Sequence, residues 1–152
     1  MSEIKEGAKA PNFKGVDQNG NSISLSDYSN KKLILYFYPK DDTPGCTKEA
    51  CNLRDNYDSL KLNDFEVVGV SADNSAKHLK FIAKYDLPFS LIADTEKEII
   101  KSFDCWGLKK FMGREYEGIF RKTFVIENGK IIKIFEKVKT TDHYQQIIDA
   151  IN

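Results

Sequence analysis

The chain has 152 residues, 41% of them hydrophobic and 30% charged, which is typical of a folded globular protein and excludes a disordered or fibrous one. This length suits one domain with a sizeable core. Its 23 basic residues balance its 23 acidic residues. Nucleic-acid-binding proteins usually carry a basic excess, so we expect no nucleic-acid partner.

Two further features bear on where the protein works. No apolar run approaches the roughly 18 residues that a membrane span requires, and residues 1–10 lack the apolar core of a secretory signal. Three cysteines are too few for a disulfide scaffold. We therefore expect a cytoplasmic protein with no membrane partner, whose cysteines serve either packing or chemistry.

The first thirty residues predict a short N-terminal hairpin, because apolar side chains flank a turn at residues 19–21. They are Phe13, Val16, Ile23 and Leu25. The run LILYFY at residues 33–38 is continuously apolar and is closed by Pro39. Its length and aromatic content predict a strand that is buried on both faces.

A helix is expected next, because apolar side chains recur at steps of three and four residues between positions 46 and 60. They are Cys46, Ala50, Leu53, Tyr57 and Leu60. The remaining pattern predicts, in order, a strand at 67–70, a helix at 75–85, a strand at 89–92, a short helix at 95–103, a hairpin with strands at 124–126 and 131–135, and a helix at 144–151. This order predicts an α/β fold in a single domain over 1–152, with a mixed central sheet flanked by helices. A thioredoxin-like fold fits the pattern, as do other α/β folds.

The stretch that carries chemistry lies between the strand at 33–38 and the helix that follows, where open α/β sheets usually place their sites. Thr43 and Pro44 are expected as the N-cap and the first residue of that helix. Cys46 then falls in the first turn, among backbone N–H groups without helical partners. The positive end of the helix dipole stabilises a thiolate there. A cysteine on the apolar stripe of a helix is otherwise most often a small core residue. The residues around Cys46 therefore decide whether it is a catalytic thiol or a packing residue.

Those neighbours favour catalysis on a small polar electrophile. Stabilising a thiolate accelerates its attack only slightly, because a more stable thiolate is a weaker nucleophile. Most of the rate must therefore come from fixed donors that polarise the electrophile. The loop offers the Thr43 hydroxyl and the backbone N–H groups of Gly45 and Cys46, while Pro39 and Pro44 would stiffen the loop and exclude water.

A second cysteine, Cys51, lies five residues beyond Cys46. On an intact helix their Cα atoms would be about 8.6 Å apart, whereas a disulfide needs less than about 7 Å. The two can therefore pair only if the first turns unwind. The spacing differs from the Cys-x-x-Cys of thioredoxin-type reductases. It also gives no metal-binding pattern with His78 or His143, which we expect on helix surfaces, so no metal or cofactor is expected.

The pattern Pro39-x-x-x-Thr43-x-x-Cys46 resembles the active-site motif of the peroxiredoxins. The longer CTKEAC at residues 46–51 is similar to the bacterioferritin-comigratory protein, or peroxiredoxin Q, subgroup. The resemblance runs through nearly the whole chain, at GAKAPNF (7–13), FYP (37–39), VGVS (68–71), WG (106–107), FMG (111–113) and GIFRKTF (118–124).

This resemblance implies a thiol peroxidase that acts on hydrogen peroxide or organic hydroperoxides. Cys46 would attack the peroxide, release water or an alcohol, and become a sulfenic acid. Pro39, Thr43 and Arg121 match the family's positions for shielding the thiolate and for hydrogen bonding to the thiolate and the peroxide. Cys51 matches the resolving cysteine, which would form an intramolecular disulfide with Cys46 after local unwinding. Thioredoxin or a similar dithiol reductant would then restore the thiols.

Several residues also have simpler interpretations. Glu49 is either a capping-box partner of the helix, a solvated charge or a catalytic group, and Trp106 with Phe111–Met112 is expected to pack around the rim of the site. Cys105 is expected as a buried or half-buried thiol without a role carried over from the family. Because the chain ends at Asn152 after one helix, without a further cysteine, we expect a monomer.

Two other functions stay open on the sequence. A thioredoxin-like disulfide reductase would reduce insulin disulfides without peroxide, and a non-catalytic holdase or interaction module would show no stoichiometric thiol oxidation by peroxide. The spacing of Cys46 and Cys51 disfavours the first alternative. Thr43 and Arg121, the latter otherwise a plain solvated charge, favour the peroxidase.

Overall fold

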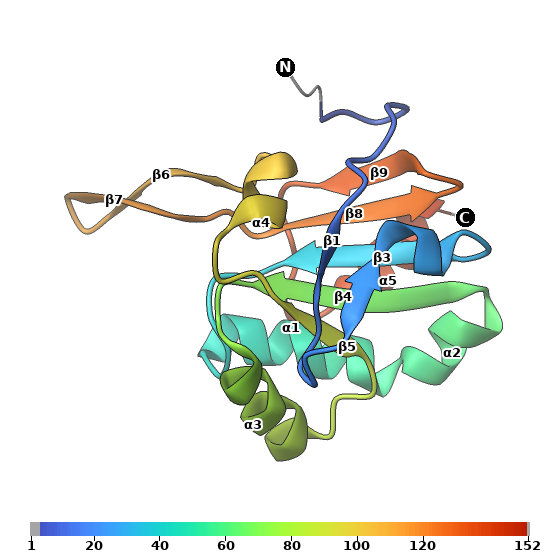
Figure 1. Cartoon of the computed structure of the whole chain (residues 1–152), viewed down its shortest axis with the longest axis horizontal. Coiled ribbons are helices and arrows are strands. Elements are labelled where there is room, and N and C mark those ends of the chain that lie inside the picture. Colours follow the sequence, from blue (N-terminus) through green and yellow to red (C-terminus); the bar gives the residue numbers. More distant parts are fainter. Residues whose placement is uncertain (1–3, 152) are drawn as a thin grey trace.

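A five-stranded sheet forms the centre of the computed structural model, which describes residues 4–151 (Figure 1). Its strands are β3 (Lys32–Phe37), β4 (Phe65–Ser71), β5 (Ser90–Ala93), β8 (Lys122–Glu127) and β9 (Lys130–Phe135). They lie in the order β5-β4-β3-β8-β9. β3, β4 and β5 are parallel, whereas β8 runs antiparallel to β3 and β9 antiparallel to β8. The predicted mixed sheet is therefore confirmed.

The central strand β3 is buried on both faces, as its apolar run predicts. Successive side chains of a strand point to opposite faces. Leu33, Leu35 and Phe37 belong to one core cluster, and Ile34 and Tyr36 belong to the other. Two apolar layers thus hold β3 in place, and the loop that follows it starts from a rigid point.

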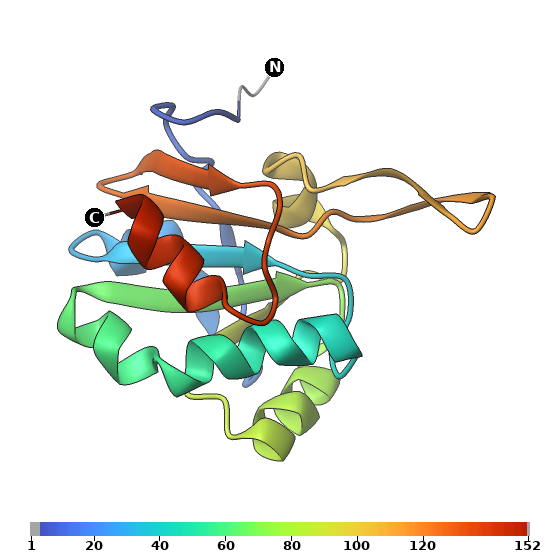
Figure 2. The same cartoon turned by 180° about the vertical axis from the view of Figure 1, so that it is seen from behind.

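Helices cover one face of the sheet (Figure 2). They are α1 (Pro44–Asp55), α2 (Tyr57–Leu62), α3 (Ser75–Tyr85) and α5 (His143–Ile151). Each adds a buried apolar side chain to the same cluster, in chain order Leu53, Leu60, Phe81 and Ile147. The opposite face is covered by α4 (Glu98–Ser102) and the N-terminal segment, which are in front of the sheet in Figure 1. That segment contains the predicted hairpin, β1 (Lys14–Val16) and β2 (Ser22–Ser24), followed by the 3-10 helix η1 (Leu25–Tyr28).

The helix predicted over residues 46–60 is divided into α1 and α2 at Asn56. The side-chain amide of Asn56 donates to the carbonyl of Asn52 at 2.8 Å, and its backbone N–H bonds to the Leu53 carbonyl three residues back. Asparagine side chains compete with the helical backbone in this way. The apolar stripe continues across the break, which is why periodicity alone could not reveal it.

Besides the two predicted hairpins there is a third, β6 (Trp106–Phe111) and β7 (Arg114–Ile119), which was not predicted. It projects away from the sheet in both Figure 1 and Figure 2. Its strands turn through Met112 and Gly113, both with positive φ. Most of its side chains are exposed, so it lacks the alternation of apolar and polar residues that marks a half-buried strand. Within residues 4–151, no helix has the length and apolar character to cross a membrane.

Candidate active site

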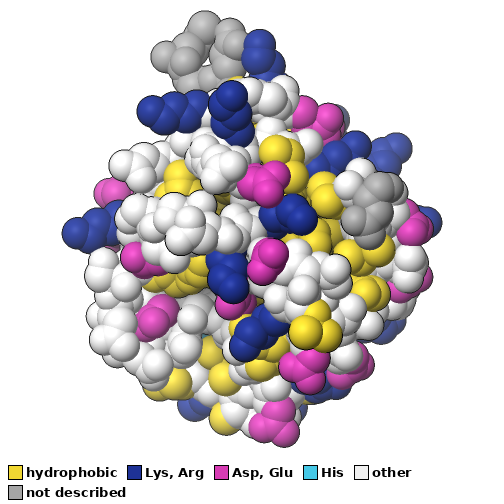
Figure 3. All heavy atoms as spheres, turned by 90° about the vertical axis from the view of Figure 1, so that its right-hand side faces the viewer, with side chains coloured by type: hydrophobic (Ala, Val, Ile, Leu, Met, Phe, Trp, Pro, Cys, Tyr) yellow, Lys and Arg dark blue, Asp and Glu magenta, His cyan; other side chains and the backbone are white. Residues whose placement is uncertain are grey.

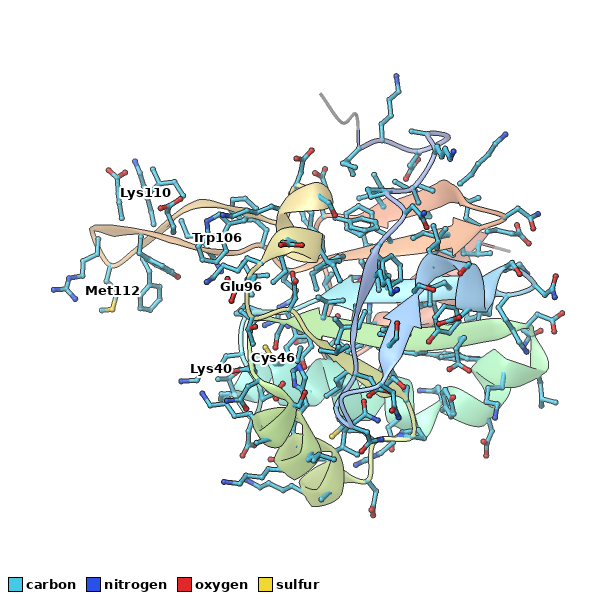
Figure 4. All side chains as sticks on the ribbon, viewed as in Figure 1. Lys40, Cys46, Glu96, Trp106, Lys110 and Met112 are labelled. Carbon is cyan, nitrogen blue, oxygen red and sulfur yellow. The ribbon has the colours of Figure 1, made fainter. Side chains whose placement is uncertain are left out.

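Cys46 lies in the first turn of α1, directly after the loop that leaves β3. Thr43 occupies the N-cap with extended backbone and Pro44 begins the helix, so both predicted positions are confirmed. The cysteine is 1% exposed, and the backbone N–H groups of Gly45 and Cys46 have no partner within the helix. Figure 4 shows Cys46 near Lys40 at this end of the sheet. The sulfur is thus held in a sheltered place at the positive end of a helix.

Arg121 contacts Cys46 although it lies 75 residues further along the chain. It lies between β7 and β8, where it is part-buried, and its Nη2 donates to the Cys46 sulfur at 3.2 Å. Burial lowers the pKa of this guanidinium, but Glu49 and Cys46 outweigh that effect and keep its pKa above the ordinary value. The sequence-predicted pair of Cys46 and Arg121 is therefore brought together by the fold.

Glu49 is the third member of this cluster, so of the interpretations that the sequence left open, a cap and a solvated charge do not hold. Its side chain is fully buried, and its Oε1 accepts a hydrogen bond from Arg121 Nη1 at 2.8 Å. Oε2 is buried and has no hydrogen-bond partner among residues 4–151. Burial raises the pKa of Glu49 to about 7, although Arg121 acts in the opposite direction. The guanidinium of Arg121 thus binds the sulfur of Cys46 and the carboxyl group of Glu49 at the same time.

His143 lies behind Glu49, and the expectation of a surface histidine is wrong here too. The ring is fully buried. Its Nδ1 is 2.9 Å from the Gln146 Oε1, which can only accept, so Nδ1 carries the hydrogen. Nε2 then accepts from the Thr123 hydroxyl at 2.8 Å, and it lies 3.7 Å from Glu49 Oε2. Burial lowers the pKa of His143 to about 4, so the ring is neutral at pH 7.

His78 is also fully buried, on the inner side of α3. Its Nδ1 lies 2.6 Å from Asp41 Oδ2 in the loop before α1. Both histidines share a helix face with apolar residues, Phe81 for His78 and Ile147 for His143, at helical steps of three and four. In the sequence, this spacing indicates that both histidine rings face the interior of the protein.

The remaining loop residues make different contacts from those expected. The Thr43 hydroxyl donates to the Lys40 carbonyl at 2.8 Å, and it caps no helical N–H. A Cβ atom at Gly45 would lie 3.2 Å from Arg121 Nη2, so glycine leaves room for the guanidinium. Pro39 is half-buried at the end of β3. A surface hollow of about 430 Å³ opens beside Lys40, but neither Cys46 nor Arg121 lines it.

The other two cysteines differ in accessibility. Cys51 is half-buried on α1, and burial raises its pKa. Because α1 is continuous from Pro44 to Asp55, helix geometry keeps Cys46 and Cys51 about 8.6 Å apart at Cα. Cys105 is fully buried, as predicted, and burial raises its pKa to about 12. A thiol with so high a pKa is unreactive at pH 7.

The aromatic residues expected around the rim separate into two groups. Trp106 is half-buried and packs against the core at the base of the β6–β7 hairpin. Phe111 and Met112 are 65% and 86% exposed, and Figure 4 shows Met112 far from Cys46 at the hairpin tip. The expectation that these two pack around the site is wrong, because the hairpin carries them outward.

A thioredoxin-like sheet that presents a sheltered cysteine to an arginine defines a class of thiol-based redox proteins. The chain belongs to the AhpC/TSA family, whose sequence model matches residues 7–134. It is 46% identical over 149 residues to peroxiredoxin Bcp of Bacillus subtilis, covering 97% of this chain and 95% of the relative. It is 41% identical over 150 residues to peroxiredoxin Bcp of Escherichia coli, covering 98% and 96%.

Solved structures agree with these sequence relatives. A Xylella fastidiosa PrxQ structure is similar with a TM-score of 0.91 at 29% identity, covering 99% of this chain and 97% of that one. A peroxidoxin BcpB from Mycobacterium tuberculosis gives 0.84 at 28% identity, covering 99% of each chain. The resemblance to the bacterioferritin-comigratory protein and peroxiredoxin Q subgroup is confirmed, as are the thioredoxin-like fold and the activity of a thiol-dependent peroxidase. The protein acts on a peroxide and depends on a thiol reductant.

Proposed function

We propose that Cys46 is the nucleophile of the peroxidase reaction. The observation that carries this proposal is the hydrogen bond from Arg121 Nη2 to the Cys46 sulfur, because it fixes a charged donor beside the atom that attacks and near the oxygens on which charge develops. The sulfur attacks one peroxide oxygen, so that an S–O bond forms and the O–O bond breaks. The other oxygen leaves with a proton as water or an alcohol, and Cys46 becomes a sulfenic acid.

The surrounding groups stabilise the charge that develops as the O–O bond breaks. Arg121 is placed to contact both the sulfur and the peroxide, and the N–H groups of Gly45 and Cys46 are free donors at the helix terminus. The Thr43 hydroxyl is available if the peroxide displaces it from the Lys40 carbonyl. Pro39, half-buried beside them, limits access of water. Glu49 holds the second arm of Arg121 and so orients it.

We propose that Cys51 resolves the sulfenic acid. Its thiol attacks the Cys46 sulfur, an S–S bond forms and water leaves. The helical separation of the two residues requires that the first turns of α1 unwind before this step. Thioredoxin or a similar dithiol protein then reduces the disulfide by thiol–disulfide exchange, and its own dithiol becomes a disulfide.

The proposal also covers which peroxides the protein reduces, where in the cell it works and whether it is a monomer. A Xanthomonas campestris bacterioferritin comigratory protein, 29% identical with a TM-score of 0.85 and covering 91% of this chain and 88% of that one, is described as reducing alkyl peroxides. We extend this to hydrogen peroxide and organic hydroperoxides here. A cycle that must return to free thiols suits a reducing cytoplasm. We also propose a single domain, since one sheet serves both core layers, and we propose that the protein is a monomer.

Replacement of the nucleophile tests the proposal. Cys46→Ser should abolish peroxide consumption supported by a thioredoxin system, measured by NADPH oxidation with thioredoxin reductase. Cys105→Ser is the matched control, because that thiol is buried and unreactive, and it should keep nearly full activity. Retention of activity in Cys46→Ser would remove Cys46 from its role. Reduction of insulin disulfides by the wild type without peroxide would favour a disulfide reductase instead.

A further inference from the structure

The loop between β3 and α1 is tied to the rest of the fold by one buried side chain, that of Asp41. Its Oδ1 accepts a hydrogen bond from the Tyr38 hydroxyl at 2.6 Å, and its Oδ2 lies 2.6 Å from His78 Nδ1 on α3. The backbone N–H of Asp41 donates to Asp73 Oδ2 at 2.8 Å. Asp41, three residues before the start of α1, is therefore held by three contacts.

His78 makes the opposite half of this contact. Its Nε2 lies 2.9 Å from the Ile92 carbonyl on β5, which can only accept, so Nε2 carries a hydrogen. Nδ1 makes its hydrogen bond with the Asp41 carboxyl group. Both ring nitrogens and both carboxyl oxygens thus have partners in a buried place. Removing one partner would leave a buried polar group unsatisfied, which is costly.

A second contact, between the next residue of the loop and α3, is exposed. Asp42 has a left-handed backbone with φ of 55°, and its carboxylate accepts hydrogen bonds from Lys84 and Tyr85, each at 2.8 Å. Exposed ion pairs contribute little to stability. The buried contact of Asp41 with His78 is therefore the one that holds the loop.

Another anchor occurs further along α1, at Asn52. Its Oδ1 accepts from the Tyr144 backbone N–H at 2.7 Å, and its Nδ2 donates to the Thr141 carbonyl at 3.3 Å. These bonds tie the middle of α1 to the N-terminal end of α5. Cys51 is the residue directly before this anchor, so it stays in place when the turns before it open.

Between the two anchors, the first turns of α1 are held by contacts that the reaction itself changes. The bond from Arg121 Nη2 ends on the Cys46 sulfur, which is the atom that the peroxide oxidises, so formation of the sulfenic acid changes the acceptor of this bond. We propose that the Asp41–His78 contact and Asn52 are two anchors that confine the unwinding of α1 to residues 44–51. They are positioning residues: the first keeps Cys46 in its peroxide-reactive place, and the second holds Cys51 where Cys46 can reach it.

This inference rests on the proposed role of Cys51, and hydrogen exchange followed by mass spectrometry tests it. The reduced protein and the protein treated with one equivalent of hydrogen peroxide are compared, after peptide mapping has established the Cys46–Cys51 disulfide. Loss of protection should be confined to peptides within residues 44–51, while residues 38–42, α3 and residues 53–55 keep theirs. Loss that spreads into α3 or past Asn52 would overturn the anchors and leave the proposed function intact. Absence of the disulfide would overturn both.

A substitution tests the first anchor separately. Asp41→Asn keeps the shape of the side chain but weakens the contact with His78, so the unwinding should no longer stop at residue 44. In the disulfide form of this variant, the loss of protection relative to its own reduced form should extend to residues 38–42. Lys84→Ala removes only the exposed contact with Asp42 and is the matched control, with the loss still confined to residues 44–51. Loss confined to residues 44–51 in Asp41→Asn as well would contradict the role of Asp41.

Discussion

Arg121 contacts both ionisable groups that flank it, the Cys46 sulfur through Nη2 and the Glu49 carboxyl through Nη1. Its charge acts on the sulfur before the reaction and on the peroxide oxygens during it. Donors aimed at developing charge are commonly worth about 10²- to 10³-fold in rate. Arg121 is therefore the residue, after Cys46 itself, on which the peroxide step depends most.

Substitution of Arg121 tests its contribution to the reaction with peroxide. Arg121→Ala should lower the second-order rate constant for peroxide by about 10²- to 10³-fold, because both the sulfur and the leaving oxygen lose a charged donor. The rate constant can be followed by stopped-flow fluorescence of Trp106 or by competition with a peroxidase of known rate. Lys122→Ala removes the positive charge of the neighbouring residue, which makes no hydrogen bond to Cys46, and serves as the control. Equal rate constants for Arg121→Ala and wild type would remove Arg121 from the site.

Glu49 gives a prediction for stability against pH. Its pKa of about 7 in the folded protein lies above the ordinary value of 4.5, so the folded state holds a proton that the unfolded state has lost between these pH values. The stability due to the protonated group is fully present below pH 4.5 and is lost as pH rises through 7. Wild type should therefore lose roughly 3 kcal/mol relative to Glu49→Gln across this range.

Urea unfolding of both proteins at several pH values between 4.5 and 8 measures this difference. His143, whose pKa is lowered to about 4, contributes with the opposite sign, because its stability is lost as pH falls. It is present in both proteins, so the difference isolates Glu49. Parallel stability curves for wild type and Glu49→Gln would show that the buried carboxyl does not titrate in this range.

Comparison of single residues shows which parts of the site could be predicted from the sequence. The motif and its resemblance were sufficient for Cys46 and Arg121, although 75 residues separate them. Glu49 was left undecided and His143 was misplaced, because a polar side chain is buried only where another segment supplies its partner. Those partners, Arg121 for Glu49 and Thr123 for His143, come from distant parts of the chain.

At the scale of elements, α1 has two functions that conflict. Its intact first turns shelter Cys46, yet they keep Cys51 too far away to form a disulfide. The helix must therefore be stable enough to favour the reactive form and weak enough to open in each cycle. Gly45 in its first turn lowers helix stability by about 1 kcal/mol relative to alanine and leaves room for Arg121.

Removing the resolving thiol separates these two functions. Cys51→Ser should keep the reaction of Cys46 with the first equivalent of peroxide, because the folded helix is unchanged. It should lose turnover with thioredoxin, because no intramolecular disulfide forms, and the sulfenic acid becomes open to further oxidation. Single-turnover and steady-state rates measure the two steps. Full turnover in Cys51→Ser, with Cys105 also replaced, would assign resolution elsewhere.

Most elements could be predicted because their apolar residues follow the period of a helix or a strand. The β6–β7 hairpin could not, since it buries little and its strand residues are exposed. The interruption of the long helix at Asn56 was hidden for a different reason, because a side-chain hydrogen bond to Asn52 causes it while the apolar stripe continues.

The whole molecule depends on a sheet with an apolar core on each face. Phe124 on β8 is fully buried and packs edge to face or tilted against Phe37 and Phe103, with ring centroids 5.6 and 5.0 Å away. These rings support β3 from the face that α4 and the N-terminal segment cover. On the surface, Figure 3 shows basic and acidic side chains intermingled on the face away from the β6–β7 hairpin.

Truncation of this core gives the prediction for overall stability. Phe124→Ala should lower the free energy of unfolding by about 3–5 kcal/mol, because it removes buried contacts and leaves a cavity. Phe111→Ala is the matched control, since Phe111 is 65% exposed, and it should change stability by less than about 0.5 kcal/mol. Urea unfolding followed by circular dichroism compares them. Equal losses for the two variants would contradict the assignment of the core.

The central claim is that peroxide oxidises Cys46 and that α1 then opens to join it to Cys51. Mass spectrometry with peptide mapping of the cysteines, after one equivalent of hydrogen peroxide, tests it most directly. We predict a Cys46–Cys51 disulfide within seconds, with Cys105 still open to alkylation once the protein is denatured. Three free thiols after this treatment would contradict the account, since Cys46 would then not react with peroxide. A disulfide that includes Cys105 would contradict the role of Cys51.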